Sequence, residues 1–490
     1  MRHALTALLL AATTSAAALA QEQTSGPILT LEEAVQLSMR NNPTHLTALS
    51  QRDRTSAQLR TAYGQWLPQV NSSFGSSFTK GGPLVFDGQQ IGSNPDQLGS
   101  SYSISAGVSF NGSSLMRPRS ARANLNAADA EVRGSEATTR AQVVTFYLDA
   151  LQAQAQVALQ DTLLANQQAQ LDLNRAREQV GAGTALDVRN AEVTVGTQRL
   201  AVLQARNRAA NALMVLFQQM GVPQPEGVRL VTTFPMAEPT LQLEELLAMA
   251  RGGNPVLNAA RARESAASVQ VAMARSRWLP TLSLSTGWSG FTNRVTDIDP
   301  QIASAAAGRT NSRRSCFTSD SIRSGAGLAP LGGCDGIVFT DADAAALRAA
   351  NDKYPFSFTK QPFGYRVSVS LPIFDGFSRE EGIQAAQAQR NESRYAVRRQ
   401  ELQLTTDVTT AYRNLVTQYE AVALQQQTRD AAQQALALAQ ERYRVGASTF
   451  IEVSTARNNF ERAGTDLINA IYDFHKFFAA LEQAVGRPLR

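Results

Sequence analysis

Two long stretches without proline limit what this chain can fold into more than any other feature. They cover residues 119–222 and 373–487, and all eighteen prolines lie outside them. Because proline breaks the interior of a helix, each stretch can form very long helices. A glycine-containing turn interrupts each stretch once, so each stretch predicts a long helical hairpin with a tip.

The two tips have related sequences, and the relation extends well beyond them. The first tip begins Val-Gly-Ala-Gly-Thr at residue 180, and the second begins Val-Gly-Ala-Ser-Thr at residue 445. Upstream, Leu-x-Leu-Glu-Glu, Asn-Pro and Trp-Leu-Pro each occur twice with a constant spacing of 212 residues. Such self-similarity indicates an internal duplication. We predict a tandem repeat, with residues 21–240 as the first copy and residues 241–490 as the second.

Within the first copy, the helix bounds can be placed from start and stop signals. Thr30 and Glu33 form a capping-box pattern, which starts a helix that runs to about residue 65 with a break at Pro43. The first hairpin should consist of helices at about 113–179 and 185–220. A proline-rich linker at 223–239 then precedes the second copy.

Short segments between the helices alternate apolar with small polar residues, which is the pattern of half-buried strands. The candidate strands cover residues 70–78, 102–110, 282–288 and 363–371. The first two are about ten residues long, which suffices to cross a bilayer when the strand is tilted. We expect the apolar side chains to face lipid and the serines and glycines to face the interior. A soluble hairpin with one face on a core is the alternative interpretation.

The mature sequence predicts no helical membrane span, because it holds no run of about 18 apolar residues. Entry into a membrane would then require a closed β-barrel, since lipid cannot satisfy open sheet edges. Four strands cannot close such a barrel, for which at least about eight are needed, so the chain should oligomerise. Bacterial barrels keep their long loops outside. We therefore expect residues 79–101 and an insertion at about 291–362 to face the cell exterior.

The first twenty residues have the pattern of an export signal, with cleavage predicted between Ala20 and Gln21. Residue 21 is not cysteine, so an N-terminal lipid anchor is not expected. An exported chain meets an oxidising compartment. That compartment favours a disulfide between Cys316 and Cys334 over a metal site.

Several function classes find little support in the sequence. The net charge of +5 is spread thinly and the arginines are scattered, which argues against a nucleic-acid partner. The glycines at 181 and 183 follow a helix and lack the lysine of a phosphate-binding loop. With two histidines after the predicted signal, no Ser-His-Asp arrangement or metal cluster is evident, so we predict neither an enzyme nor a cofactor.

The doubled order of these motifs resembles the TolC family of outer-membrane channel proteins over essentially the whole mature chain. The resemblance implies a homotrimer in the outer membrane, in which each chain gives four strands to one twelve-stranded β-barrel continued by a periplasmic α-helical barrel. It implies a passive exit duct for drugs, small toxic compounds or proteins of type I secretion. Its expected partners are a periplasmic adaptor (membrane fusion) protein and, through it, an inner-membrane RND or ABC transporter.

The resemblance also implies roles for the hairpin tips, which in this family meet the adaptor and close the tunnel. The residues expected to dock the adaptor are Val180, Gly181, Thr184, Leu186, Val445, Gly446 and Thr449. The residues expected to form the periplasmic gate are Asp187, Asn190, Tyr443 and Glu452. Two positions depart from the family pattern, because Thr455 replaces a second acid and Ser448 replaces an arginine partner of the tyrosine.

Other readings of the sequence explain less of it. An exported structural or adhesive coiled-coil protein would account for the long helices but not for the alternating strands or the doubled Trp-Leu-Pro motif. An ordinary porin would need more strands and no long helices.

Overall fold

The computed structural model describes residues 27–230, 234–236 and 238–489. The predicted signal peptide, with its cleavage site at Ala20 and Gln21, lies outside the described residues. The chain divides into a helical unit, made of residues up to 53, 126–264 and those from 393 onward, and a sheet unit, made of 54–125 and 265–392. Each unit takes segments from both predicted repeats, so residue 240 does not separate the units. The tandem repeat itself stays a prediction.

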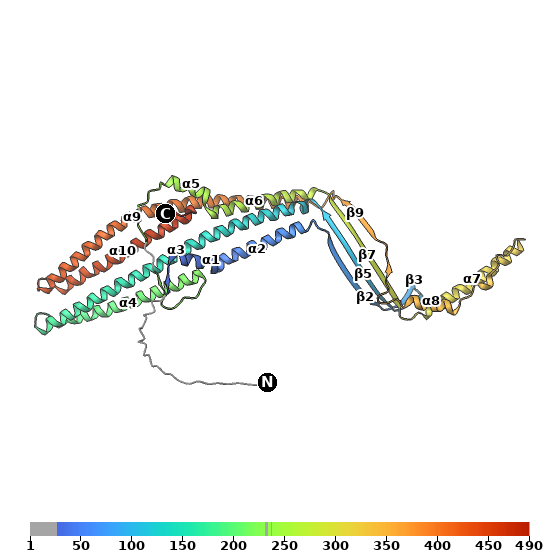
Figure 1. Cartoon of the computed structure of the whole chain (residues 1–490), viewed down its shortest axis with the longest axis horizontal. Coiled ribbons are helices and arrows are strands. Elements are labelled where there is room, and N and C mark those ends of the chain that lie inside the picture. The colour runs from blue at the N-terminus through green and yellow to red at the C-terminus, as the bar shows by residue number, and fades with distance from the viewer. Residues whose placement is uncertain (1–26, 231–233, 237, 490) are drawn as a thin grey trace, which may run out of the picture. The chain divides into compact units, whose positions relative to one another are not determined.

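The helical unit contains most of the two long hairpins that the proline-free stretches predict. The first pairs α3 (Gly112–Gln179) with α4 (Ala185–Met220), and the second pairs α9 (Ser378–Arg444) with α10 (Phe450–Val485) (Figure 1). With 68 residues, α3 is about 100 Å long. No helix in the described part of the chain is both long and apolar enough to span a membrane.

Shorter helices accompany each hairpin: α1 (Leu31–Asn41) and α2 (Pro43–Gly64), then α5 (Leu243–Gly253) and α6 (Pro255–Arg275). As predicted, Thr30 caps α1 through a capping box with Glu33.

The Asn-Pro motif has a structural reason in both copies. The Asn42 side chain donates to the carbonyl oxygen of Gln219 at 2.7 Å, and Asn254 donates to that of Ala484 at 2.9 Å. Each asparagine thus satisfies a carbonyl at the end of α4 or α10, where helix carbonyls lack intrahelical partners.

Apolar clusters hold each hairpin against its short helix. In the first, Tyr147 and Met220 are fully buried, and the Tyr147 hydroxyl donates to the Leu29 carbonyl at 2.8 Å. In the second, Leu415 and Phe474 are buried beside α5. Burial of one such side chain stabilises the fold by about 1.5–3 kcal/mol. Part of the linker is a short strand, β6 (Arg229–Leu230), which pairs in parallel with β1 (Ile28–Leu29).

The sheet unit contains the long strands β2 (Gln69–Thr79), β5 (Gln97–Phe110), β7 (Thr281–Val295) and β9 (Gly364–Ser370). They pair antiparallel in the order β2-β5-β7-β9, and the short strand β8 (Thr359–Lys360) also pairs with β7. The register aligns the alternating residues of all four strands. One face carries Val70, Phe74, Tyr102, Ile104, Val108, Leu282, Leu284, Trp288, Val367 and Val369. The other carries Ser73, Gly75, Ser103, Ser105, Gly107, Ser283, Ser285 and Ser368.

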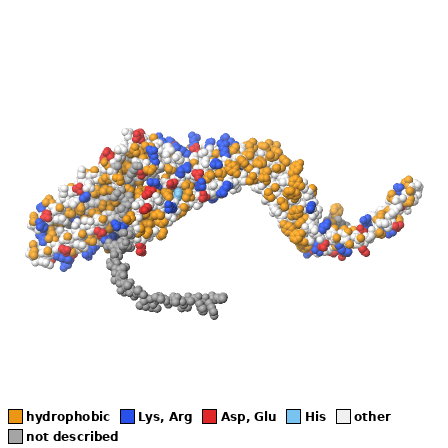
Figure 2. Space-filling view, in the orientation of Figure 1, with side chains coloured by type: hydrophobic (Ala, Val, Ile, Leu, Met, Phe, Trp, Pro, Cys, Tyr) orange, Lys and Arg blue, Asp and Glu red, His pale blue; other side chains and the backbone are white. Residues whose placement is uncertain are grey.

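Both faces of this sheet are largely open to solvent. Val70 is 70% exposed and Tyr365 is 77% exposed on the apolar face. Hydrophobic side chains gather over the sheet in the space-filling view (Figure 2). We call this surface the apolar face and the opposite one the serine face.

The predicted loops contain secondary structure that the sequence analysis missed. Residues 79–101 include a hairpin of β3 (Gly82–Phe86) and β4 (Gln89–Asn94). Its turn places Asp87 at φ 49° and Gly88 at φ 75°, as Asp-Gly hairpin turns require.

The predicted insertion starts later than residue 291, because β7 continues to Val295. It then holds α7 (Asp299–Gly325) and α8 (Asp341–Asn351). The remaining elements are the 3-10 helices η1 (Ser276–Trp278) and η2 (Cys334–Gly336).

Candidate functional site: the hairpin tips

The two tips, residues 180–184 and 445–449, share one backbone design. Gly181 has φ 70° and Gly446 has φ 79°, a left-handed conformation that favours glycine. The amide after each glycine closes the turn: Ala182 donates to the Arg177 carbonyl and Ala447 donates to the Arg442 carbonyl, both at 2.8 Å. The related sequences therefore produce the same sharp reversal between long helices.

The caps of the following helices differ between the tips. Thr184 caps α4 in a complete capping box, where its hydroxyl donates to Asp187 Oδ2 at 2.8 Å and the Asp187 amide donates back at 3.2 Å. Thr449 caps α10 by accepting from the Glu452 amide at 3.4 Å. Within the described residues, the Glu452 carboxylate has no hydrogen-bond or ion-pair partner, and this side chain is exposed. Of the two acids that follow the capping threonines, only Glu452 therefore keeps an uncommitted carboxylate within the described residues.

Both tips also present apolar side chains to solvent. Val180 is 77% exposed and Leu186 is 67% exposed at the first tip. Val445 is 70% exposed and Ile451 is 73% exposed at the second. Ile451 occupies the position that Leu186 has in the first tip, and the sequence analysis did not include it. Exposed apolar side chains at the end of a hairpin offer a surface for a protein partner.

A contact just behind the tips joins the two hairpins. We call Asn174, Arg177 and Tyr443 the cross-hairpin contact. The Tyr443 hydroxyl donates to Asn174 Oδ1 at 3.1 Å, and the Arg177 guanidinium carbon lies 4.6 Å from the centre of the Tyr443 ring. Arg177 also donates to the carbonyl oxygen of Tyr443 and, at 3.1 Å, to that of Ala182. A single arginine thus ties the first tip to the second hairpin.

The cross-hairpin contact is largely shielded from water. Tyr443 is 5% exposed. Burial, followed by the nearby Asp187 carboxylate, raises the pKa of Tyr443 above its ordinary value, against the opposing effect of Arg177. Phe450, at the start of α10, packs against the apolar clusters of both hairpins, which contain Val188 and Val453. The hairpins therefore meet through the packing of Phe450 as well as through the cross-hairpin contact.

The structure treats the predicted gate residues unequally. Tyr443 lies in the cross-hairpin contact, and Asp187 is committed to its cap while the Asn174 amide donates to its carbonyl at 3.3 Å. Asn190 and Glu452 are exposed, and in the described part of the chain their side chains join no contact. The sequence analysis missed Asn174 and Arg177. A signal existed for the arginine, because Arg442 stands at the same distance before the second tip and also donates to its own turn, at 3.4 Å.

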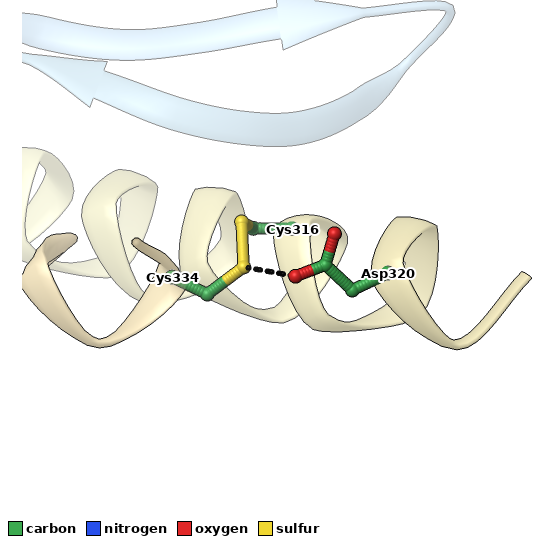
Figure 3. Close-up of side chains that lie close together, drawn as sticks. All are labelled: Cys316, Asp320 and Cys334. Carbon is green, nitrogen blue, oxygen red and sulfur yellow. Dashed lines mark hydrogen bonds between the residues drawn. A yellow bond between two sulfur atoms is a disulfide. The ribbon is translucent and has the colours of Figure 1, made fainter. Parts of the chain in front are cut away.

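The two cysteines are bonded to each other, with the sulfur atoms 1.95 Å apart (Figure 3). Asp320 lies beside them and accepts from the amide of Leu331 at 2.5 Å, so its carboxylate holds the turn that leads to Cys334. Cys316, Asp320 and Cys334 are close enough together to suggest a metal site. The disulfide leaves no thiolate to bind a metal there.

Comparison with known proteins shows which family has this architecture. The sequence profile of outer membrane efflux proteins matches residues 34–222 and 340–487, which include both tips. The chain belongs to the outer membrane efflux protein family. CyaE of Bordetella pertussis is 29% identical over 268 residues, which are 53% of this chain and 54% of CyaE. The match thus spans about half the length of that relative.

A second relative of this efflux family aligns over almost the entire chain. The outer membrane protein TolC of Vibrio cholerae is 22% identical over 469 residues, 93% of this chain and 90% of TolC. The solved structure of the CmeC outer membrane channel of Campylobacter jejuni superposes with a TM-score of 0.68, at 15% identity, over 93% of this chain and 85% of CmeC. The fold is therefore that of the TolC-like channels, and the family assigns this efflux protein to the outer membrane.

Proposed function

We propose that this chain is the outer-membrane exit duct of a tripartite efflux pump, a type I secretion system or both. It would conduct drugs, small toxic compounds or secreted proteins passively, as a channel rather than an enzyme. The energy would come from an inner-membrane RND or ABC transporter, which reaches the duct through a periplasmic adaptor protein. Membership of the outer membrane efflux protein family supports this proposal.

The observation that carries the proposal is the two-faced sheet. Side chains such as Phe74, Val367 and Val369 are 57%, 58% and 70% exposed on the apolar face. On the opposite face serines and glycines would line a wet interior. A lipid-facing apolar band and a polar interior are the pattern of membrane barrels. Because four strands per chain cannot close one, we propose a homotrimer with a shared twelve-stranded β-barrel.

The long hairpins would form a helical tunnel in the periplasm, with the tips at the end farthest from the membrane. There Val180, Leu186, Val445 and Ile451 would dock the adaptor, because their apolar side chains are largely exposed to solvent. The insertion with α7 and α8 would face the cell exterior. The internal repeat would give each chain two quasi-equivalent hairpins, six in the trimer.

Glu452 would supply the charge of the gate. Three copies of an uncommitted carboxylate around a narrow mouth would attract cations. Tyr443 would set the position of the second hairpin relative to the first, and Asp187 would hold the first tip at the mouth through its cap. Asn190 would lie at the mouth as a neutral neighbour.

Deletion of the gene, with complementation by the intact chain, tests the proposal. We expect the deletion strain to become sensitive to toxic compounds or to lose secreted proteins. The purified protein should run as a heat-modifiable trimer and form channels in planar bilayers. An exported coiled-coil adhesin, the competing interpretation, would give neither the transport defect nor the channels, and that result would overturn the proposal.

A further inference from the structure

A segment of the sheet unit lies across the apolar face near the end of β2. We call residues 353–363 the strap. The hydroxyls of Tyr354 and Ser76 are 2.9 Å apart, and the Ser100 hydroxyl donates to the carbonyl oxygen of Pro355. Aromatic contacts fasten the strap further. The ring centre of Phe356 lies 6.1 Å from that of Phe74, and the ring centre of Phe358 lies 4.9 Å from that of Tyr102.

Two polar side chains at the strap end of the apolar face are buried. Ser100 is 4% exposed and Thr292 is 3% exposed, although neighbouring residues of the same strands are open to solvent. Gly290 makes the approach possible, since a Cβ there would lie 2.5 Å from Tyr102 and 3.1 Å from Phe358. A hydroxyl turned toward hydrocarbon would be costly without a partner. Covering these hydroxyls suits a surface that contacts lipid.

Along β7 and β9, the side chains on the apolar face change in a definite order. Aliphatic residues such as Leu282 and Val369 come first, and aromatic residues including Trp288 and Phe363, whose ring centres are 5.3 Å apart, come next. Cationic residues come last, at the end that the strap covers. Membrane proteins have this order from the hydrocarbon to the headgroups, with aromatic residues at the interface.

The cations at this end are unusual for this chain. It has only four lysines, and three of them, Lys80, Lys353 and Lys360, flank the strap end of the sheet. All three are exposed, and within the described residues none forms an ion pair. The neighbouring Arg294 is already paired with Asp352 at 3.7 Å. Lysine is a flexible point charge that binds phosphate, and its long stem lets the ammonium reach headgroups.

We propose that the strap is a binding site for the phosphorylated lipid of the outer leaflet. Lys353 and Lys360, helped by Lys80, contact the phosphate groups. The rings of Phe356, Phe358 and Trp288 lie among the first carbons of the acyl chains. The inference rests on the proposed function in one respect, because it needs the apolar face to meet lipid with the insertion outward.

Lipid binding to the purified full-length protein in detergent, followed by native mass spectrometry, tests the site. The probes are lipid A with two phosphates and the same lipid after removal of both phosphates. We expect the intact protein to prefer the phosphorylated form by about tenfold, since each lysine near an anionic headgroup contributes a severalfold gain in affinity. Inorganic phosphate at the same concentration should not displace the lipid.

The matched variants are Lys353→Gln/Lys360→Gln and Arg314→Gln/Arg366→Gln. Both remove two exposed charges, but Arg314 lies on α7 and Arg366 lies on the serine face of β9. We expect the lysine variant to bind phosphorylated lipid A about tenfold more weakly and the arginine variant to bind it like the intact protein. Equal binding of the two lipids by the intact protein, full binding by the lysine variant, or displacement by inorganic phosphate would each contradict the site.

Channel conductance of the same proteins in planar bilayers separates this inference from the proposed function. Full lipid binding by a lysine variant that still conducts overturns the lipid site and leaves the duct intact. Absence of any channel, with phosphate-dependent lipid binding still present, overturns the duct and supports the site.

Discussion

The two tips have nearly the same backbone but use their acidic residues differently. At the first tip, the Asp187 carboxylate completes the cap of α4. At the second, the Glu452 side chain does not bond back to the cap, and its carboxylate extends into solvent. Arg177, just before the first tip, also stacks on the ring of Tyr443 in the second hairpin. The exposed Glu178 stands at the position of that tyrosine in the first tip.

This difference indicates a division of labour between the two related tips, in which the first has a structural role and the second carries the free charge. The first tip uses its charged groups for its own stability and for holding its neighbour. The second tip keeps its acid available and depends on the first for its position. Loss of the cross-hairpin contact should therefore release the tip of the second hairpin and leave the first tip in place.

The largest effect should come from Tyr443→Ala. The variant removes a buried ring, its hydrogen bond to Asn174 and the face on which Arg177 stacks, which together should cost about 3 kcal/mol. We expect faster hydrogen–deuterium exchange around the second tip and a higher single-channel conductance. Glu178→Ala, at the exposed equivalent position, is the control. Equal exchange in the two variants would mean that the contact does not hold the second hairpin.

Replacing the capping threonine should destabilise the first tip more than the second. Thr184→Ala removes a reciprocal capping box and should destabilise the first tip by about 1–2 kcal/mol, whereas Thr449→Ala should cost about 0.5–1 kcal/mol. Hydrogen exchange of the first turns of α4 and α10 measures both. A larger loss at the second tip would show that Glu452 takes part in its cap after all.

A smaller, pH-dependent effect follows from the raised pKa of Tyr443. Below the ordinary tyrosine pKa of about 10, the side chain is neutral in both the folded and the unfolded chain, and the contact has its full stability. As the pH rises above 10, Tyr443 loses its proton in the unfolded chain before it does so in the folded chain. The free energy of unfolding therefore falls until the pH passes the raised pKa of the folded state. Ultraviolet titration of the intact protein against Tyr443→Phe should reveal one tyrosine that titrates late. If Tyr443→Phe instead removes a tyrosine that titrates near the ordinary pKa of about 10, the pKa of Tyr443 is not raised.

The sequence predicted the long elements well and the contacts between them poorly. The absence of proline predicts the hairpins, and period-two alternation predicts β5 and β7. Both signals can be read from neighbouring residues alone. The bonds of Tyr443 to Asn174 and Arg177 join segments far apart in the chain, and no local pattern encodes them. α7 was missed because its serine- and glycine-containing sequence lacks an apolar stripe, although its alanines favour a helix. The short β1–β6 pair is too brief to leave a pattern at all.

The most direct test of the division of labour is the block of the channel by divalent cations. Glu452→Gln and Asp187→Asn each remove one carboxylate with almost no change in shape. Measured in planar bilayers, Glu452→Gln should weaken the divalent block by about tenfold and raise conductance. Asp187→Asn should leave the block unchanged and loosen only the first tip. The opposite ranking, or no effect of Glu452→Gln, would contradict the claim that the second tip carries the charge of the gate.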